Sequence, residues 1–365
     1  MKIVIFGLTI SSSWGNGHAN LWRGLCRALA QLGHRIVFFE RDASYYAQHR
    51  DFSELPGGRL VLYPDWESVR RQVAAELSDA DLAITTSYCP DALPAADLLL
   101  SSKAMTVFYD LDTPVTLSRV AAGEPVPYIG GRGLGDFDLV LSYTGGGALQ
   151  ALQRRLGARR AVPLYGHVDP AVHRPAAPQA RYRADLSYLG TYAADRQATL
   201  ERLFLEPARR REACTFLIGG AQYPAEFPWA KNIRFVRHVA PADHPAFFSS
   251  SRLTLNVTRQ AMAEMGWCPS GRLFEAAACG AAILSDTWEG LDSFFAPGGE
   301  ILVARNSDDA VSALDLGDAE IARIAAAARE RVLAGHTSMH RARELLAALE
   351  QPQSRQQPAA AIMEA

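Results

Sequence analysis

Residues 268–286 read CPSGRLFEAAACGAAILSD and contain a complete helix followed by a strand. The segment 269–271 (Pro-Ser-Gly) predicts a helix start, the helix body covers 272–279, and Gly280 ends it. The apolar run 282–285 then predicts a buried strand. A helix joined to a strand by so short a turn is the repeating unit of a parallel α/β sheet.

The same alternation of strands and helices runs through both halves of the chain. Helical patterns cover 19–32 and 68–77 in the first half, and 319–349 near the end, with Gly335 as a break. The predicted strands of the first half are 2–8, 35–39, 60–62, 82–85, 104–108, 139–141 and 160–164. Those of the second half are 186–189, 215–218, 233–236, 252–257, 282–285 and 300–303. The predicted fold class is therefore α/β with parallel sheets.

A chain of 365 residues favours two cores. Residues 166–185 hold three prolines and no periodicity, which is typical of an interdomain linker. We therefore predict two Rossmann-like domains, 1–168 and 169–350, with the terminal helices able to pack back on the first. The Gln/Pro/Ala-rich tail 351–365 is predicted to be disordered. Ligands of such sheets bind beyond the carboxyl ends of the strands, which here means the cleft between the domains.

Composition excludes several classes of partner. The net charge of −2 gives no reason to expect nucleic acid or an anionic membrane as the main partner. No apolar stretch is long enough for a membrane span, and the first residues enter a strand directly, so we expect no signal peptide. Five cysteines without C-x-x-C spacing predict neither a zinc site nor a disulfide framework. A reducing cytoplasmic location fits these features, and the sequon 256–258 is interpreted as a chance match within a strand.

The start of the helix at 272–279 has the features of a phosphate site. Free N–H groups and the positive end of the helix dipole favour an anion there, Ser270 can cap the helix or contact a phosphate, and Gly271 allows close approach. Arg272 and Glu275 lie one turn apart on nearly the same face, offering a cation for a pyrophosphate and a carboxylate for sugar hydroxyls. An ordinary salt bridge between these two side chains is the alternative.

The segment 272–286 and the following W-E-G-L-D-S-F-F-x-P-G-x-E-I-L resemble the donor-site block of glycosyltransferases with the glycosyltransferase-B fold. Among these, the CgeB-like group is the most similar. The related group-one family has an E-x(7)-E pattern whose second Glu binds the nucleotide ribose, and Glu275 matches that position. The first Glu would fall at position 267, which is Trp, so this chain departs from the pattern.

Three further stretches carry the resemblance. The loop after the strand at 186–189 resembles the family's diphosphate loop, which implies phosphate contacts by Gly190, Thr191 and Arg196. Arg259, at the end of the strand 252–257, would be a second cation. Residues 165–170 (YGHVDP) resemble the G-V-D segment at the domain crossover, with His167 inserted.

Three residues of the first half are candidate catalytic groups. Asp110 and Asp112 end a strand two residues apart, and His18 opens the helix 19–32. The resemblance implies that arginines and helix dipoles, and no metal, neutralise the diphosphate; the two aspartates are then acceptor-side residues, the alternative being a cap on the turn before Pro114. His18 is the preferred base, because a helix N-terminus favours a neutral imidazole. The glycines of the turn 143–147 indicate close approach of a ligand or of the other domain.

The loop 11–19 (SSSWGNGHA) is interpreted as a cleft loop containing Gly15, Asn16 and Gly17. A dinucleotide fingerprint is rejected, because the third glycine of G-x-G-x-x-G is missing and the pair lies too far beyond the strand. A plain turn with a hydrogen-bonded histidine is the alternative. On this interpretation the first domain binds the acceptor and the second binds the donor.

The resemblance implies transfer of a sugar from a nucleotide-diphosphate-sugar co-substrate to an acceptor hydroxyl, with no cofactor and no metal. Two alternatives stay open. One is an epimerase or phosphorylase of the same fold acting on a nucleotide sugar. The other is a non-catalytic glycan-binding or surface-assembly protein. The sequence leaves the donor, the acceptor and the oligomeric state open.

Overall fold

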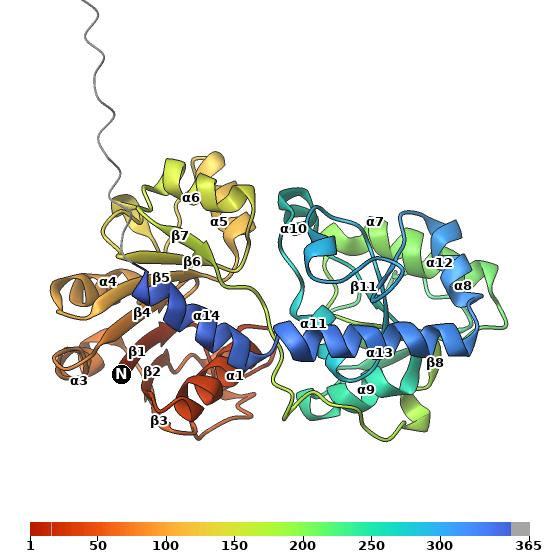
Figure 1. The fold of residues 1–365 in the computed structure, drawn as a ribbon, viewed down its shortest axis with the longest axis horizontal. Helices are drawn as coiled ribbons and strands as arrows, with labels where there is room; N and C mark the ends of the chain where they lie inside the picture. The colour runs from red at the N-terminus through yellow and green to blue at the C-terminus, as the bar shows by residue number, and fades with distance from the viewer. Residues whose placement is uncertain (16, 352–365) are drawn as a thin grey trace, which may run out of the picture.

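The computed structural model describes residues 1–15 and 17–351. The predicted cleft residue Asn16 lies outside the described residues, as does the predicted tail from residue 352 onward. Within the described part, two parallel sheets form two domains joined by residues 164–183 (Figure 1). This confirms the predicted α/β fold class.

The N-terminal sheet has the strand order β3-β2-β1-β4-β5-β6-β7 among the described residues. Its central strands are apolar on both faces, as expected for a sheet covered by helices on each side; every residue of β1 is buried. The strands are β1 (Lys2–Gly7), β2 (Arg35–Arg41), β3 (Gly58–Tyr63), β4 (Leu82–Thr86), β5 (Met105–Asp110), β6 (Leu139–Ser142) and β7 (Ala161–Pro163).

The C-terminal sheet has the order β10-β9-β8-β11-β12-β13 within the described ranges. Its strands are β8 (Ala184–Leu189), β9 (Phe216–Gly220), β10 (Ile233–Arg237), β11 (Ser251–Asn256), β12 (Ala282–Ser285) and β13 (Leu302–Val303). In both sheets the order reverses beside the first strand of the domain, so the carboxyl ends of β1 and β4, and of β8 and β11, flank the switch points at which ligands bind.

Helices connect the strands and cover the sheets. Those of the N-terminal domain are α1 (His18–Gln31), α2 (Ser44–Ala47), α3 (Trp66–Leu77), α4 (Ala92–Ser101), α5 (Thr113–Ala121) and α6 (Gly147–Leu156). Those that follow are α7 (Gln197–Leu200), α8 (Glu206–Arg210), α9 (His244–Ser250), α10 (Gln260–Met265), α11 (Gly271–Ala278), α12 (Ser307–Leu314), α13 (Asp318–Gly335) and α14 (Ser338–Glu350). A π-helical turn, Glu201–Leu205, joins α7 to α8.

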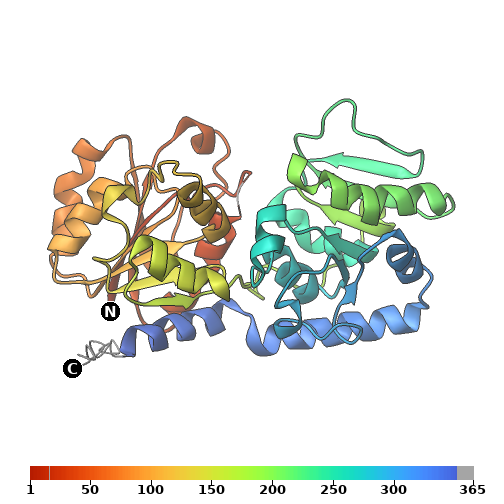
Figure 2. The ribbon, with the colours of Figure 1, turned by 90° about the horizontal axis from the view of Figure 1, so that it is seen from above.

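The chain crosses between the domains twice. After the connection at 164–183, α13 lies on the C-terminal domain, and α14 returns to pack on α1 (Figures 1 and 2). The two crossings are bonded to each other: Val168 pairs with Thr337, and His167 shares a hydrogen bond with Ser338 at 3.0 Å. Ala342 and Leu345 of α14 are fully buried in the core of the N-terminal domain. The core of the N-terminal domain is therefore completed by α14, which follows the C-terminal domain in the sequence.

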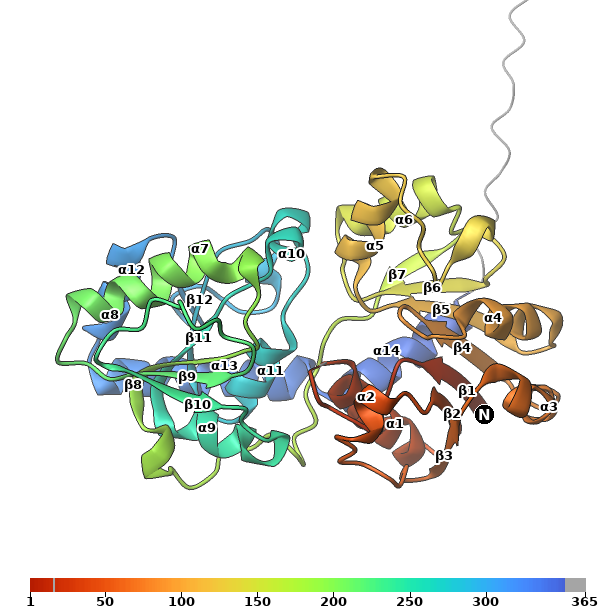
Figure 3. The same cartoon turned by 180° about the vertical axis from the view of Figure 1, so that it is seen from behind.

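A second contact joins the domains at the turn after β6. The Gly145 N–H donates to the Trp267 carbonyl at 2.9 Å, and the Tyr143 hydroxyl donates to the Pro269 carbonyl at 2.8 Å. A Cβ on Gly146 would lie 2.4 Å from the Trp267 ring. The glycines of this turn thus serve approach of the other domain. Nearby, α10 lies against α5 (Figure 3).

Among the described residues, no helix is both long and apolar enough to cross a membrane.

We expect Gly146→Ala to lower the free energy of unfolding by about 1–3 kcal/mol. Its backbone, at φ 54° and ψ −137°, is open almost only to glycine, and the new Cβ would also meet Trp267. Gly147→Ala is the matched control: it opens α6, no atom lies within 4 Å of its would-be Cβ, and it should be neutral or gain up to about 1 kcal/mol. Urea unfolding of both variants checks this, and equal stabilities would contradict it.

Candidate active site

The N-terminus of α11 faces the switch point of the C-terminal sheet. Ser270 is its N-cap in extended conformation, and its side chain makes no capping bond. The first N–H groups of this helix are therefore left for a ligand. The alternative of a salt bridge is not what the described residues show: Arg272 and Glu275 form no ion pair, because Arg272 turns toward β8 and β11 while Glu275 turns toward His173.

Arg272 is held in a half-buried position by two neighbours. Its Nη1 donates to Oδ1 of Asn256 at 3.2 Å, and its guanidinium lies 5.2 Å from the centre of the Tyr188 ring. Burial lowers the pKa of Arg272, and the nearby Arg196 lowers it further. Asn256 is itself 1% exposed and donates to the Ser285 hydroxyl at 3.0 Å, which fits the interpretation of its sequon as a chance match.

Arg196 brings a second positive charge to the same place. Its Nη1 donates to the Thr191 carbonyl at 3.4 Å, and its Nε is buried without a hydrogen-bond partner in the described residues. A Cβ on Gly190 would lie 2.7 Å from the Tyr188 hydroxyl and 3.1 Å from Nη2 of Arg272, so only glycine keeps the space between them open. Neither Arg196 nor Arg272 has an ion-pair partner in the described part of the chain, and the two repel each other. This is an anion-binding geometry.

Arg259 differs from the other two arginines. Its Nε donates to Oδ2 of Asp195 at 3.0 Å, so its charge is partly neutralised within its own domain. It also interacts with Asp112 of the N-terminal domain. Arg259 therefore links the donor-side and acceptor-side residues of the prediction.

His18, Tyr88 and Asp112 form a chain on the N-terminal side. The ring centres of His18 and Tyr88 lie 5.9 Å apart, and the Tyr88 hydroxyl donates to Oδ2 of Asp112 at 2.9 Å. Burial lowers the pKa of His18 to about 4, so its imidazole is neutral at pH 7. Burial raises the pKa of Asp112, while the Tyr88 hydroxyl and the Arg259 guanidinium act in the opposite direction. Asp112 is the N-cap of α5 without a capping bond from its side chain, so the capping alternative does not describe it.

Asp110 lies beneath this surface. Its side chain is fully buried, and its Oδ1 accepts the N–H of Asp112 at 3.1 Å. Burial raises its pKa to about 6. The structure thus brings Asp112 and His18 to the facing surface and places Asp110 behind them, supporting the turn.

Glu40 organises the loop after β1. Its buried carboxylate accepts the N–H groups of Ile10 and Ser11 at 2.7 and 2.9 Å, and the Thr9 hydroxyl at 2.8 Å. This is the acidic residue a dinucleotide site would use on a ribose, and here it holds its own chain. The rejection of a dehydrogenase site agrees with this arrangement.

The rest of that loop reaches the other domain. The Trp14 ring stacks on His49 at 4.0 Å and packs against His238 of the C-terminal domain at 4.3 Å. Gly15 adopts φ 68°, and Gly17, the N-cap of α1, is exposed. The loop therefore spans the interface beside His18.

Glu275 lies at a cavity of about 380 Å³ between the domains. The residues that line the cavity come from α1, from the connection between the domains and from the segment 240–242 that precedes α9. They include Arg23, His173 and Ala240. Trp267, at the position of the first Glu of the family pattern, is instead wedged between Gly146 and Gly290. Its ring is therefore an interdomain contact.

Residues 196–347 match the family described as glycosyl transferase-like. The whole chain is similar in structure to sucrose-phosphate synthase of Thermosynechococcus elongatus, with a TM-score of 0.66, 14% identity, and coverage of 95% of this chain and 99% of that one. It is similarly close to Anabaena HepE in complex with UDP and glucose (TM-score 0.67, 13% identity, 96% and 100% covered). Trehalose-6-phosphate synthase OtsA is similar with a TM-score of 0.65 and 11% identity, and the match covers 96% of this chain and 99% of that one. No match was found among curated proteins.

The chain has the glycosyltransferase-B fold. The match to the glycosyl transferase-like family lies in the second half of the chain and includes α11. The prediction of a glycosyltransferase is thereby confirmed at the level of the domain and the fold. The role of each site residue stays a prediction.

Asp110→Asn should stabilise the protein in a pH-dependent way. Below about pH 4 the carboxyl is protonated in both folded and unfolded chains. As pH rises it ionises first in the unfolded chain, since its folded pKa is about 6 against an ordinary 3.8, and the wild type loses stability. We therefore expect the stability of the Asn variant relative to wild type to rise by up to about 3 kcal/mol between about pH 4 and pH 7. Unfolding at both pH values measures it; a difference that does not change with pH would contradict the buried placement.

Proposed function

We propose that the protein transfers a sugar from a nucleotide-diphosphate sugar to an acceptor hydroxyl, without a metal ion. The observation that carries the proposal is the pair Arg196 and Arg272, two neighbouring cations without an ion-pair partner in the described residues, beside the open N-terminus of α11. Two guanidinium groups and a helix N-terminus can neutralise a diphosphate as it leaves. The CgeB-like group is the subfamily we propose.

The donor would lie across the C-terminal switch point. Its diphosphate would meet Gly190, Thr191 and the two arginines, and its ribose hydroxyls would meet Glu275 one turn further along α11. The complexes of HepE with UDP and with UDP-glucose support a UDP-sugar as the first donor to try. The five cysteines, all within the described residues, are free thiols, which supports our proposal of a reducing cytoplasmic location.

The transfer step needs two changes of charge. The acceptor oxygen attacks the anomeric carbon, and the bond from that carbon to the diphosphate oxygen breaks with its electron pair on the diphosphate. Arg196 and Arg272 stabilise that charge. The acceptor proton goes to His18 or Asp112 if the configuration inverts, and to the departing diphosphate if it is retained. Arg259, between Asp195 and Asp112, would hold the two sides in register.

Arg272→Ala and Arg196→Ala should each weaken UDP binding by about 10–100-fold, the cost of one charged hydrogen bond or more. Glu275→Ala should weaken the binding of uridine nucleotides, because the proposed contact with the ribose hydroxyls is lost. Arg323→Ala is the control, because this arginine lies on α13 and pairs with Glu320 on the surface. Calorimetric titration with UDP, GDP, ADP and dTDP measures the affinities and identifies the base. If the Arg272 and Glu275 variants bind UDP as tightly as the wild type does, the donor binds elsewhere. If the wild type binds no nucleotide, a non-catalytic protein is favoured.

His18→Ala and Asp112→Asn should lower kcat by about 10²–10⁴-fold for an inverting transfer, while UDP affinity stays near wild type. Asp110→Asn is the internal comparison, since its buried carboxylate does not face the other domain. Turnover of the donor with and without candidate acceptors measures these effects. Equal turnover in all three variants would remove the base from the N-terminal domain, and turnover without any acceptor would indicate an epimerase.

A further inference from the structure

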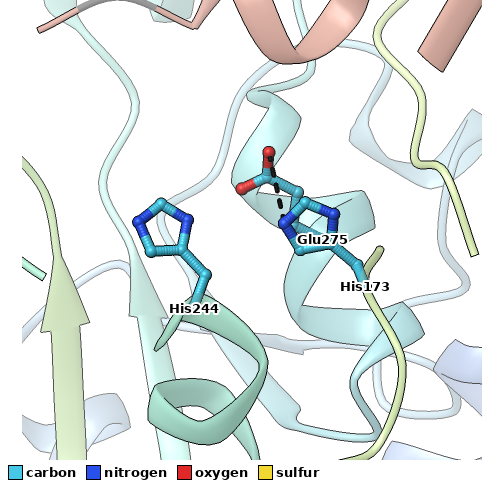
Figure 4. A group of neighbouring side chains, drawn as sticks. All are labelled: His173, His244 and Glu275. Atoms are coloured by element: carbon cyan, nitrogen blue, oxygen red, sulfur yellow. Dashed lines mark ion pairs between the residues drawn. The ribbon is translucent and has the colours of Figure 1, made fainter. Parts of the chain in front are cut away.

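Three side chains from separate parts of the C-terminal half point toward one another (Figure 4). His173 comes from the connection between the domains, His244 is the first residue of α9, and Glu275 lies in α11. One nitrogen or oxygen atom of each lies within 4.8 Å of the others, and Nε2 of His173 is 3.9 Å from Oε1 of Glu275.

Both imidazoles offer a buried nitrogen with no hydrogen-bond partner in the described part of the chain. His173 is 5% exposed, and its Nε2 makes no hydrogen bond there. Nδ1 of His244 is also buried and has no hydrogen-bond partner among the described residues. A buried polar atom without a partner costs about 1–3 kcal/mol, so two such nitrogens converging on a carboxylate indicate that a ligand completes them.

The orientation of His244 is fixed from behind. Its Nε2 lies 3.3 Å from the Val239 carbonyl, to which it donates when neutral, leaving the lone pair on Nδ1 toward the cluster. A backbone carbonyl behind a metal-binding imidazole is the usual outer support of such a ligand.

We propose that His173, His244 and Glu275 bind a divalent transition-metal ion of the Zn²⁺ class. Two imidazoles and one carboxylate are a donor set that Zn²⁺ accepts with a fourth position open to water. Bonds of about 2.0–2.2 Å separate tetrahedral ligand atoms by about 3.3–3.5 Å, so the three atoms would close in by about an ångström. The cavity of about 380 Å³ reaches His173 and Glu275 and provides both the entry path and the room for water.

No zinc-binding spacing is visible along the chain, because the three ligands come from the connection between the domains and from two different helices. The metal would tie the connection between the domains to α9 and α11 and would take no part in the transfer step itself. A further consequence rests on the proposed function, in which Glu275 binds the nucleotide ribose. A metal ion and a ribose cannot both occupy the Glu275 carboxylate, so they exclude each other. The metal would therefore inhibit donor binding.

The first test is direct binding to the full chain after treatment with a chelator. Calorimetric titration with Zn²⁺ should show one site, and Co²⁺ should give visible bands typical of nitrogen and oxygen ligands without a thiolate charge-transfer band. His173→Ala, His244→Ala and Glu275→Gln should each weaken Zn²⁺ by about 100-fold or more, since loss of even an outer support costs about 10–100-fold. His34→Ala, beside Met1 at the far end of α1, is the control. Thermal unfolding without metal shows that each variant is folded.

Absence of Zn²⁺ binding by the wild type would overturn the proposal, and so would binding that folded His173 and His244 variants retain. The second test repeats the Zn²⁺ titration with uridine present, because the nucleoside offers the ribose without the diphosphate that itself binds Zn²⁺. A lower Zn²⁺ affinity supports competition for Glu275. An unchanged affinity, with the ligand variants still defective in Zn²⁺ binding, keeps the metal site and removes Glu275 from the donor site. Failure of the metal site and failure of the donor assignment therefore give different results.

Discussion

The repulsion between Arg196 and Arg272 is the constraint around which the C-terminal domain is arranged. A guanidinium taken out of water is tolerated only with hydrogen bonds and a compensating charge. Asn256 supplies a hydrogen bond and Tyr188 an aromatic face, while no carboxylate of the described residues forms an ion pair with either arginine. The nearby backbone is shaped by the same demand: Gly190 keeps the space open, and the Tyr223 hydroxyl donates to its carbonyl at 3.1 Å.

Backbone strain gathers at the same interface. The residues other than glycine with positive φ, counted over the described ranges, are Tyr88, Gln222, His238 and Trp267. Tyr88 bonds Asp112, His238 meets Trp14, and Trp267 contacts the turn after β6. Such conformations persist where the surroundings over-determine them. Their position at the facing ends of the sheets shows that these loops are held for contact between the domains.

Local sequence patterns were sufficient for the fold. The strand predicted at 35–39 is β2, and the helix predicted at 272–279 is α11 to within one residue. Periodicity, a glycine stop and a buried apolar run are properties of neighbouring residues, so a single sequence reveals them. The four-residue helix α2 lacks a full period, and no prediction covered it.

The site was predictable only where a motif is continuous. Arg272 and Glu275 belong to one such motif. Asn256 was seen only as part of a chance sequon, and Tyr188 drew no attention, because their role depends on strands β8 and β11 lying next to each other. The trio of His173, His244 and Glu275 depends on the fold in the same way. Asp110 and Asp112 look alike in sequence, and only the end of β5 decides that one is buried and the other faces Arg259.

Because α14 returns to the N-terminal domain, that domain is built from two separate parts of the sequence. In topology, the C-terminal domain is an insertion between β7 and α14 of the first. During synthesis the described strands of the inserted domain, β8 to β13, all precede α14 of the host, so the inserted domain can complete its core first. In the finished protein the two crossings lie side by side, bonded through Val168 and Thr337. The link between the halves is therefore two bonded segments that enter and leave the inserted domain at one place, and not a single linker.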